Sequence, residues 1–317
     1  MMDDKLTADM DFVWFQGVVE NRDDPLQLGR CKVRCLGFHT HNSTQLKTEE
    51  LPWAHPLQPI TSAAMSGIGQ TPTGPVLGTW VFGFFRDGRS AQQPVIVGTM
   101  GGIPTERPPQ EVGFSDPTGV YPKEEYIGEA DTNRLARGVT MDTIVQKKLE
   151  NIDEMELATS IDGSDTVREP ETKYSAQYPL NKVTESESGH IIEIDDTEGA
   201  ERIHVYHKSG TFLEVHPGGD IVVKIGGGSG GFLTFGAKDS NINLKGDFNI
   251  TVEGDSSIYT KGDATVKTDG DFKHNVTNGD YEVNVKGEIR LNAGEGGSSI
   301  KMDGTSIREN SGSIYLN

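Results

Sequence analysis

The chain has 317 residues, and its 48 acidic and 29 basic side chains give a formal net charge of −19. This balance argues against a nucleic-acid partner, because binding to phosphates needs clustered Lys and Arg side chains. No apolar run reaches the roughly 18 to 20 residues that span a bilayer, and residues 1–11 are acidic where a signal peptide is basic and then apolar. We therefore expect a chain that folds in the cytoplasm of the cell that makes it.

The first part of the chain, residues 1–110, is nearly balanced in charge and holds all three Trp residues. Four runs rich in Val, Phe, Trp and Ile are bounded by Pro, Gly and Asp, which predicts strands at residues 12–20, 30–36, 80–85 and 94–99. About five short strands in a domain of this size favour an OB-like barrel. Because no basic groove is available for single-stranded nucleic acid, an interaction module is the expected role.

Residues 111–180 carry 15 acidic and 7 basic side chains and few large apolar ones. Only residues 141–149 have a weak helical pattern. A segment of this composition cannot bury enough apolar surface to offset its chain entropy unless it packs on another part of the protein. It predicts an acidic, extended linker with little regular structure.

Residues 181–317 hold 22 of the 39 Gly residues but only one of the 15 Pro residues. Such a region, dense in Val, Ile and Thr, indicates continuous β-structure with frequent corners. From Leu244 onward a Gly-Asp pair recurs every eight residues, and one step of nine residues precedes Gly279. The expected corner glycines are Gly246, Gly254, Gly262, Gly270, Gly279 and Gly287.

Within these octads the even-numbered positions are largely apolar and the odd-numbered ones charged. Strand side chains alternate with period two, so a repeat of eight residues keeps one face inward in every unit. The nine-residue step moves the apolar set to odd numbers, as a bulge or longer corner would. The residues expected to fill the interior are Phe248, Ile250, Val252, Ile258, Val266 and Phe272.

Eight residues supply one strand and one corner, which is too little for one chain to enclose a core. Three chains that contribute one strand each would close a three-sided prism and pair each other's strand edges. The repeat therefore predicts a homotrimer. A long meander within one subunit is the alternative.

Long stretches toward both ends of the chain resemble one known family. They comprise residues 14–30, 51–53, 58–69, 113–119, 185–190 and 195–197, together with the octads. They are similar to the central spike proteins of the contractile-tail baseplate of T4-like bacteriophages and, more distantly, to the valine-glycine-repeat spikes of type VI secretion. In the first stretch, Trp14, Gly17, Pro25 and Gly29 belong to the barrel motif.

The resemblance implies an N-terminal OB-fold domain seated on a trimeric baseplate hub, and a C-terminal triple-stranded β-helix driven through the host's outer membrane when the sheath contracts. The best-known member carries a lysozyme domain between these parts, whereas here residues 120–179 join them. The carboxylates Glu124, Glu125, Asp153 and Glu154 lie in this join, but a glycosidase needs a compact fold that raises the pKa of its acid. We therefore predict no muramidase activity and assign no catalytic residue.

Metal and partner sites have weak signals. His274 occupies an inward octad position, so three copies would meet near the trimer axis, where they could hold an ion or lie neutral with water. No other cofactor or metal site is predicted. Residues 300–317 would end the rod with open strand edges, so we expect a small tip-capping protein of the proline-alanine-alanine-arginine-repeat type.

Together, the sequence predicts an all-β chain with an OB-fold barrel (1–110), an extended linker (111–180) and a triple-stranded β-helix of a homotrimer (181–317). The expected function is a non-enzymatic baseplate spike that punctures the host envelope, assembled in the host cytoplasm and located in the virion tail. Two alternatives stay open: a trimeric tailspike depolymerase of surface glycans and a type VI secretion spike.

Overall fold

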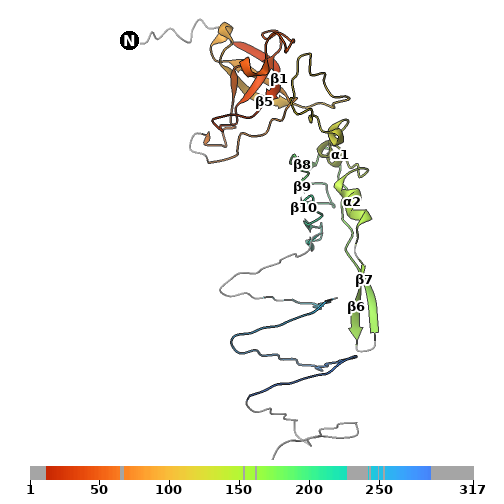
Figure 1. Ribbon diagram of the computed structural model, residues 1–317. Coiled ribbons are helices and arrows are strands. Elements are labelled where there is room, and N and C mark those ends of the chain that lie inside the picture. The colour runs from red at the N-terminus through yellow and green to blue at the C-terminus, as the bar shows by residue number, and fades with distance from the viewer. Residues whose placement is uncertain are drawn as a thin grey trace, which may run out of the picture. The chain divides into compact units, whose positions relative to one another are not determined.

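The computed structural model describes residues 12–64, 68–152, 154–160, 163–226, 242, 244–248, 250–252 and 254–286 (Figure 1). Strands dominate and helices are few, which confirms the predicted all-β class. The chain divides into two compact units, Met1–Met155 with Thr166–Asp247, and Glu156–Asp165 with Phe248–Asn317. None of the helices in the described ranges is long and apolar enough to cross a membrane.

A closed five-stranded barrel forms the first part of the chain, in the order β1-β2-β3-β5-β4. Its strands are β1 Val13–Asn21, β2 Cys31–Cys35, β3 Trp53–Pro56, β4 Trp80–Phe85 and β5 Pro94–Met100. All neighbouring pairs are antiparallel except β3 and β5. Four of the five strands were predicted, and the closed barrel agrees with the expected OB fold. The core is apolar and consists of Phe15, Val19, Cys31, Val33, Cys35, Ala54, Val81, Phe85, Ala91 and Ile96.

Two glycines let the barrel strands approach closely. A Cβ on Gly17 would lie 2.4 Å from Val33 Cγ1, and one on Gly83 would lie 2.1 Å from the carbonyl oxygen of Val95. Both distances are shorter than real Cβ contacts. Any larger residue would therefore force β1 from β2, or β4 from β5.

The segment expected to be an extended linker contains more regular structure than its composition indicated. It forms a short 3-10 helix η4 (Glu124–Tyr126), the helices α1 (Asp131–Ala136) and α2 (Ile144–Glu150), and the hairpin strands β6 (Glu154–Ser160) and β7 (Gly163–Arg168). The helices are stable because their few apolar side chains, Leu135, Ile144 and Val145, are buried against Ile191, Tyr206 and Phe212. The segment therefore packs on another part of the protein.

The residues that α1 and α2 cover form a five-stranded antiparallel sheet in the order β12-β11-β10-β9-β8 (Figure 1). Its strands are β8 Asn181–Glu185, β9 Ile191–Asp195, β10 Arg202–Tyr206, β11 Phe212–Val215 and β12 Ile221–Lys224. Each hairpin turn contains a glycine in the left-handed region: Gly189, Gly199, Gly210 and Gly219, with φ between 75° and 91°. Residues 181–226 are thus a meander of one chain, unlike the octads that follow.

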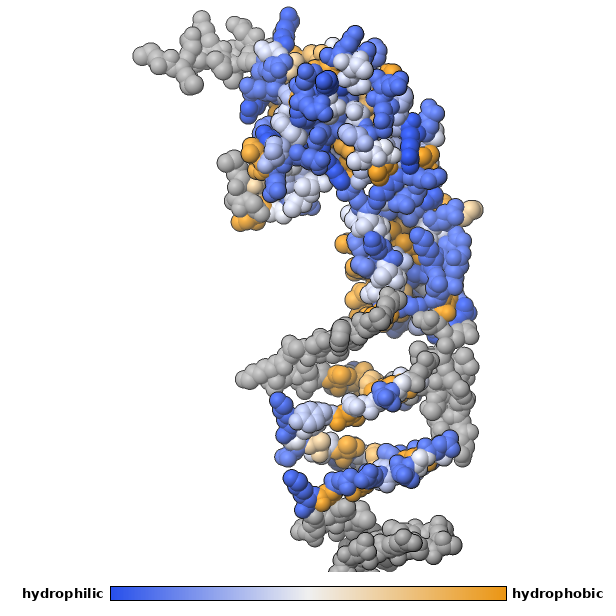
Figure 2. Space-filling view, in the orientation of Figure 1, coloured by the Kyte–Doolittle hydropathy of each residue, from blue (hydrophilic) through white to orange (hydrophobic). Residues whose placement is uncertain are grey.

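The described octad residues of the second unit form no helix or strand within the single chain. Their apolar side chains are highly exposed, and Figure 2 shows them in orange at the surface, interleaved with hydrophilic side chains in blue. One chain alone therefore gives this segment no core.

Candidate functional site: one sheet with a charged face and an apolar face

Burial alternates strictly along β9 and β10, so the sheet has two distinct faces. One row of cross-strand neighbours on the covered face is Glu193, His204 and Glu214, and the adjacent row contains Asn181, Asp195 and Arg202. We call these six residues the charged face. They are 4% exposed or less, although five of the six side chains are ionisable.

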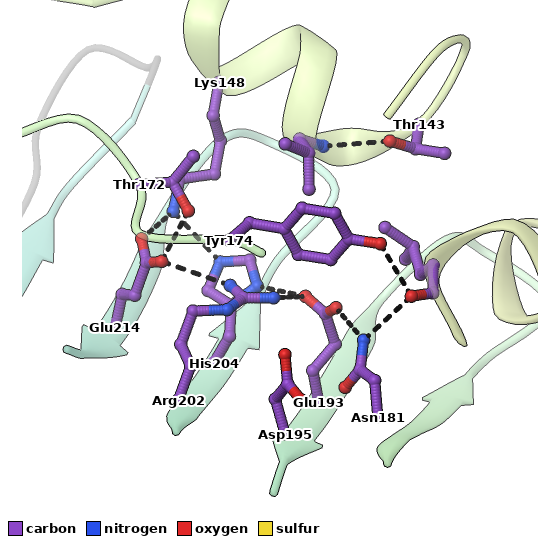
Figure 3. Close-up of polar contacts among 12 residues, drawn as sticks. Thr143, Lys148, Thr172, Tyr174, Asn181, Glu193, Asp195, Arg202, His204 and Glu214 are labelled. Carbon is purple, nitrogen blue, oxygen red and sulfur yellow. Dashed lines mark hydrogen bonds and ion pairs between the residues drawn. The ribbon is translucent and has the colours of Figure 1, made fainter. Parts of the chain in front are cut away.

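Arg202 lies between the two buried glutamates of the charged face (Figure 3). Its guanidinium nitrogens are 2.7 Å from Glu193 Oε2 and 3.1 Å from Glu214 Oε1. His204 Nδ1 lies 2.8 Å from Glu193 Oε2, and Asn181 Nδ2 donates to Glu193 Oε1 at 3.0 Å. Side chains of both neighbouring strands, β8 and β10, thus hold the Glu193 carboxylate.

The segment 131–174 supplies the remaining partners of this network. Lys148 of α2 pairs with Glu214, and its Nζ lies 3.3 Å from His204 Nε2. Thr172 Oγ1 donates to Glu214 Oε1 at 2.5 Å, and Tyr174 Oη donates to the carbonyl oxygen of Leu135 at 2.6 Å. Figure 3 shows these side chains converging from α2, the extended segment 172–174 and the sheet. The charges therefore fix α2 on the sheet.

The glutamates are ionised in this environment. Burial alone would raise the pKa of Glu193, but the hydrogen bond with His204 and the charge of Arg202 outweigh it and lower the pKa to about 2. For Glu214 burial is likewise outweighed, here by Lys148, and the pKa is again lowered to about 2. Burial lowers the pKa of His204, which favours the neutral imidazole.

The carboxylates of Glu193 and Glu214 are therefore balanced by the positive charges of Arg202 and Lys148. Removing one member of such a set leaves an uncompensated charge in a site without solvent, which costs about 3–5 kcal/mol. Each carboxylate is bound by its neighbours rather than directed at open space. The arrangement thus stabilises the attachment of the helices and has the character of a structural site.

The opposite side of the sheet is apolar and uncovered by described residues. Two rows of cross-strand neighbours cross it, Ile194–Ile203–Val215–Ile221 and Ile192–Val205–Leu213–Val223. Apart from the half-buried Val215, these side chains are between 39% and 64% exposed. A contiguous apolar surface of this kind marks an interaction site. We call it the apolar face, formed by Ile192, Ile194, Ile203, Val205, Leu213, Ile221 and Val223.

The residues of the predicted barrel motif lie in β1 and the turn that follows it. Trp14 points outward and is 57% exposed, and Gly17 is at the close approach of β1 and β2. Pro25 lies in the turn. Gly29 has a φ of 74°, and a Cβ at this position would lie 2.6 Å from the carbonyl oxygen of Pro72. The motif thus shapes one end of the barrel.

The predicted octad residues are not brought together by one chain. Phe248, Ile250, Val252, Ile258, Val266 and Phe272 are all between 49% and 97% exposed. The space beside Gly246, Gly254, Gly262, Gly270 and Gly279 is open, and only Gly279 has a positive φ, of 126°. His274 is exposed, with its ring centroid 4.7 Å from that of Tyr281. Gly287 and residues 300–317 lie outside the described residues, and among those described no group of three or more His, Cys, Asp or Glu side chains could hold a metal ion.

Sequence reasoning missed the charged face. Its residues alternate with the isoleucines and valines of β9 to β11, so the period-two pattern was visible. The pattern alone places the apolar side inward, whereas in the single chain the charged side is covered. The missing signal was the positive charge of Lys148, which pairs with Glu214 but lies in the segment predicted to be a linker.

The ionised glutamates make stability depend on acidity. In the unfolded chain they protonate near pH 4.5, but in the folded chain only near pH 2, so the unfolded state binds more protons in this window. We expect full stability above about pH 4.5 and a progressive loss as the pH falls toward 2. Glu193→Gln should lower stability at pH 7 by about 3–5 kcal/mol and flatten this loss. Thermal unfolding followed by circular dichroism at several pH values tests this, with the exposed Glu201→Gln as control; an unchanged pH profile of Glu193→Gln would contradict it.

Three comparisons of sequence relate the chain to phage proteins. A family model described as the Gp5 N-terminal OB domain matches residues 37–177. Protein Gp5 of Vibrio phage KVP40 is 44% identical over 265 residues, covering 74% of this chain and 62% of that protein. The pre-baseplate central spike protein Gp5 of Enterobacteria phage T4 is 52% identical over 130 residues, covering 39% of this chain and 22% of that protein. The chain thus spans less than two thirds of either relative. These matches confirm the resemblance drawn from the sequence: the chain is similar to the phage Gp5 proteins over the matched stretches, and residues 37–177 match their N-terminal OB domain.

Proposed function

We propose that this chain is the central spike protein of a contractile-tail baseplate, a non-catalytic homotrimer that punctures the host envelope when the tail contracts. It would assemble in the host cytoplasm and reside in the tail of the virion. The observation that carries the proposal is the apolar face, which has no cover among the described residues of its own chain. The similarity to a protein named as a pre-baseplate central spike supports the same role.

Three copies would bury the apolar face against one another around a common axis. Complete burial of a Val, Leu or Ile side chain contributes about 1.5–3 kcal/mol, so the half-exposed side chains of this face would contribute about 1 kcal/mol each. Seven such residues per chain are enough to hold a trimer together. The exposed octad residues would be covered in the same way.

A charge on either apolar surface tests the trimer, because it would appear three times in one layer. We expect Ile203→Asp in the sheet and Ile250→Asp in the octads to abolish the trimer, whereas Ile203→Val retains it. Native mass measurement and detergent resistance on gel electrophoresis provide the readout. A wild-type chain that is folded and monomeric in dilute solution would refute the proposal.

The barrel would provide the contact with the trimeric hub of the baseplate. Its outer surface carries exposed aromatic side chains in which Trp14 packs on Phe82 at 5.8 Å between ring centroids and Phe12 packs on Phe84 at 5.4 Å. Trp80, which is 47% exposed, belongs to the same strand as Phe82. Aromatic residues are enriched in interface cores, so this surface is suited to a protein partner.

Trp14→Ser combined with Phe82→Ser tests the hub contact. We expect this variant to form the trimer but to lose co-purification with the co-expressed hub protein, because the interface loses its aromatic anchors. Ile60→Ser is the matched control, since Ile60 is fully exposed in the loop between β3 and β4 and is not part of the aromatic pairs. If the double variant still co-purified with the hub protein, the hub contact would have to lie on another surface.

An enzymatic rival has one specific observation in its favour. Glu185 lines a cavity of about 450 Å³ together with Asp131 and Glu125, and burial raises the pKa of Glu185. Glycoside hydrolysis requires a carboxyl group with a raised pKa and a second carboxylate beside it. However, Arg134 of the same helix forms an ion pair with Asp131 at 2.5 Å. The second carboxylate is therefore already engaged. We therefore retain the non-catalytic reading.

A zymogram separates the two functions. We expect the purified trimer to clear neither peptidoglycan nor host surface glycan, because Arg134 already holds the Asp131 carboxylate that lies in the cavity with Glu185. Clearing by the wild-type protein that is lost in Glu185→Gln would establish the enzymatic function instead. A tip-capping partner and ions on the trimer axis near His274 stay predictions from the sequence.

A further inference from the structure

A second cavity, of about 430 Å³, lies where the end of α2 meets the β10–β11 turn and the end of β12. Four lysines from these three elements line it: Lys147, Lys148, Lys208 and Lys224. No Asp or Glu is among its lining residues. We call this cavity the lysine pocket. Such a cluster is unexpected in a chain with a net charge of −19.

Two of the four lysines have their charge compensated. Lys148 pairs with Glu214, and Lys224 Nζ lies 2.7 Å from Glu169 Oε2. Within the described part of the chain, Lys147 and Lys208 make no ion pair. Two of the four ammonium groups that line the pocket are therefore without a paired carboxylate among the described residues.

Lys147 and Lys208 also line the neighbouring cavity that holds Glu125, Asp131, Asp142 and Glu185, but among the described residues no ion pair joins either lysine to these carboxylates. The carbonyl oxygen of Lys147 accepts a hydrogen bond from Asn151 Nδ2 at 2.6 Å, and that of Asn151 accepts one from Lys224 Nζ at 2.7 Å. Two carbonyls at the negative end of α2 are thus already occupied. Phe212 and Tyr206 are buried and line the pocket. Their rings lower the local dielectric constant relative to water, which strengthens the attraction between an anion and the ammonium groups.

We propose that the lysine pocket binds a small oxyanion with about two negative charges, such as inorganic phosphate. Two unpaired ammonium groups match this charge, and each offers three donors to the oxygens. The same chemistry could be supplied by carboxylate side chains of a second copy of this chain, and the experiment distinguishes that source from the free ion.

Isothermal titration of the full chain with inorganic phosphate at low salt tests the proposal. We expect saturable binding by the wild-type protein. Loss of a hydrogen bond to a charged group corresponds to about a tenfold weaker affinity, so Lys147→Ala with Lys208→Ala should weaken binding by about a hundredfold. Lys245→Ala with Lys261→Ala, at two exposed lysines of the octad region, is the matched control and should leave the affinity unchanged.

Three results would overturn the proposal. The first is no saturable phosphate binding by the wild-type trimer, and the second is equal weakening by both double variants, which indicates unspecific attraction. The third is dissociation of the trimer in Lys147→Ala with Lys208→Ala without phosphate binding in the wild type, which assigns the pocket to carboxylates of a second copy. If the double variant does not fold, Lys208→Gln in the turn replaces it. Because trimer mass is measured in parallel, a stable trimer that binds no phosphate refutes only this inference.

Discussion

The structure depends on a sheet whose charged side is the one its own chain covers. Burying ionised side chains is costly, and here the cost is offset because two glutamates lie against Arg202 and Lys148 with further hydrogen bonds from Asn181 and Thr172. Helices α1 and α2 can therefore occupy that side. As a consequence, the apolar side is left without cover among the described residues.

The barrel could be predicted from the sequence because its strands follow local rules, whereas the strand structure of the octads stays a prediction. Four barrel strands were visible as β-type runs between turn residues, and the octad parity follows from strand geometry. The missed strand β3 has only four residues, includes the exposed His55 and ends in a Pro. Its place in the barrel is set by a parallel pairing with β5, across about forty residues of sequence, which no local pattern reveals.

The charged face and the helices that cover it could not be predicted, since each depends on the other. Helix α2 is only seven residues long and has few apolar positions, although Thr143 caps it by accepting from the Val145 N–H. It becomes stable through Ile144 and Val145 in the sheet's core and through Lys148 on Glu214. Composition treats Lys148 and Glu214 as solvated charges, and only their proximity across 66 residues makes them a buried pair.

Toward the end of the described residues, contacts within the single chain satisfy less of the structure. In the sheet, hairpins of a single chain satisfy the backbone hydrogen bonds, and only apolar cover is lacking. In the described octads, neither strand pairing nor apolar cover comes from the same chain. Unpaired backbone groups and exposed Phe and Ile side chains would both be costly in a lone chain. In the trimer proposed above, the sheet, already folded by its own charges, would present three apolar faces in register and offer a starting point from which the octads of three chains could pair.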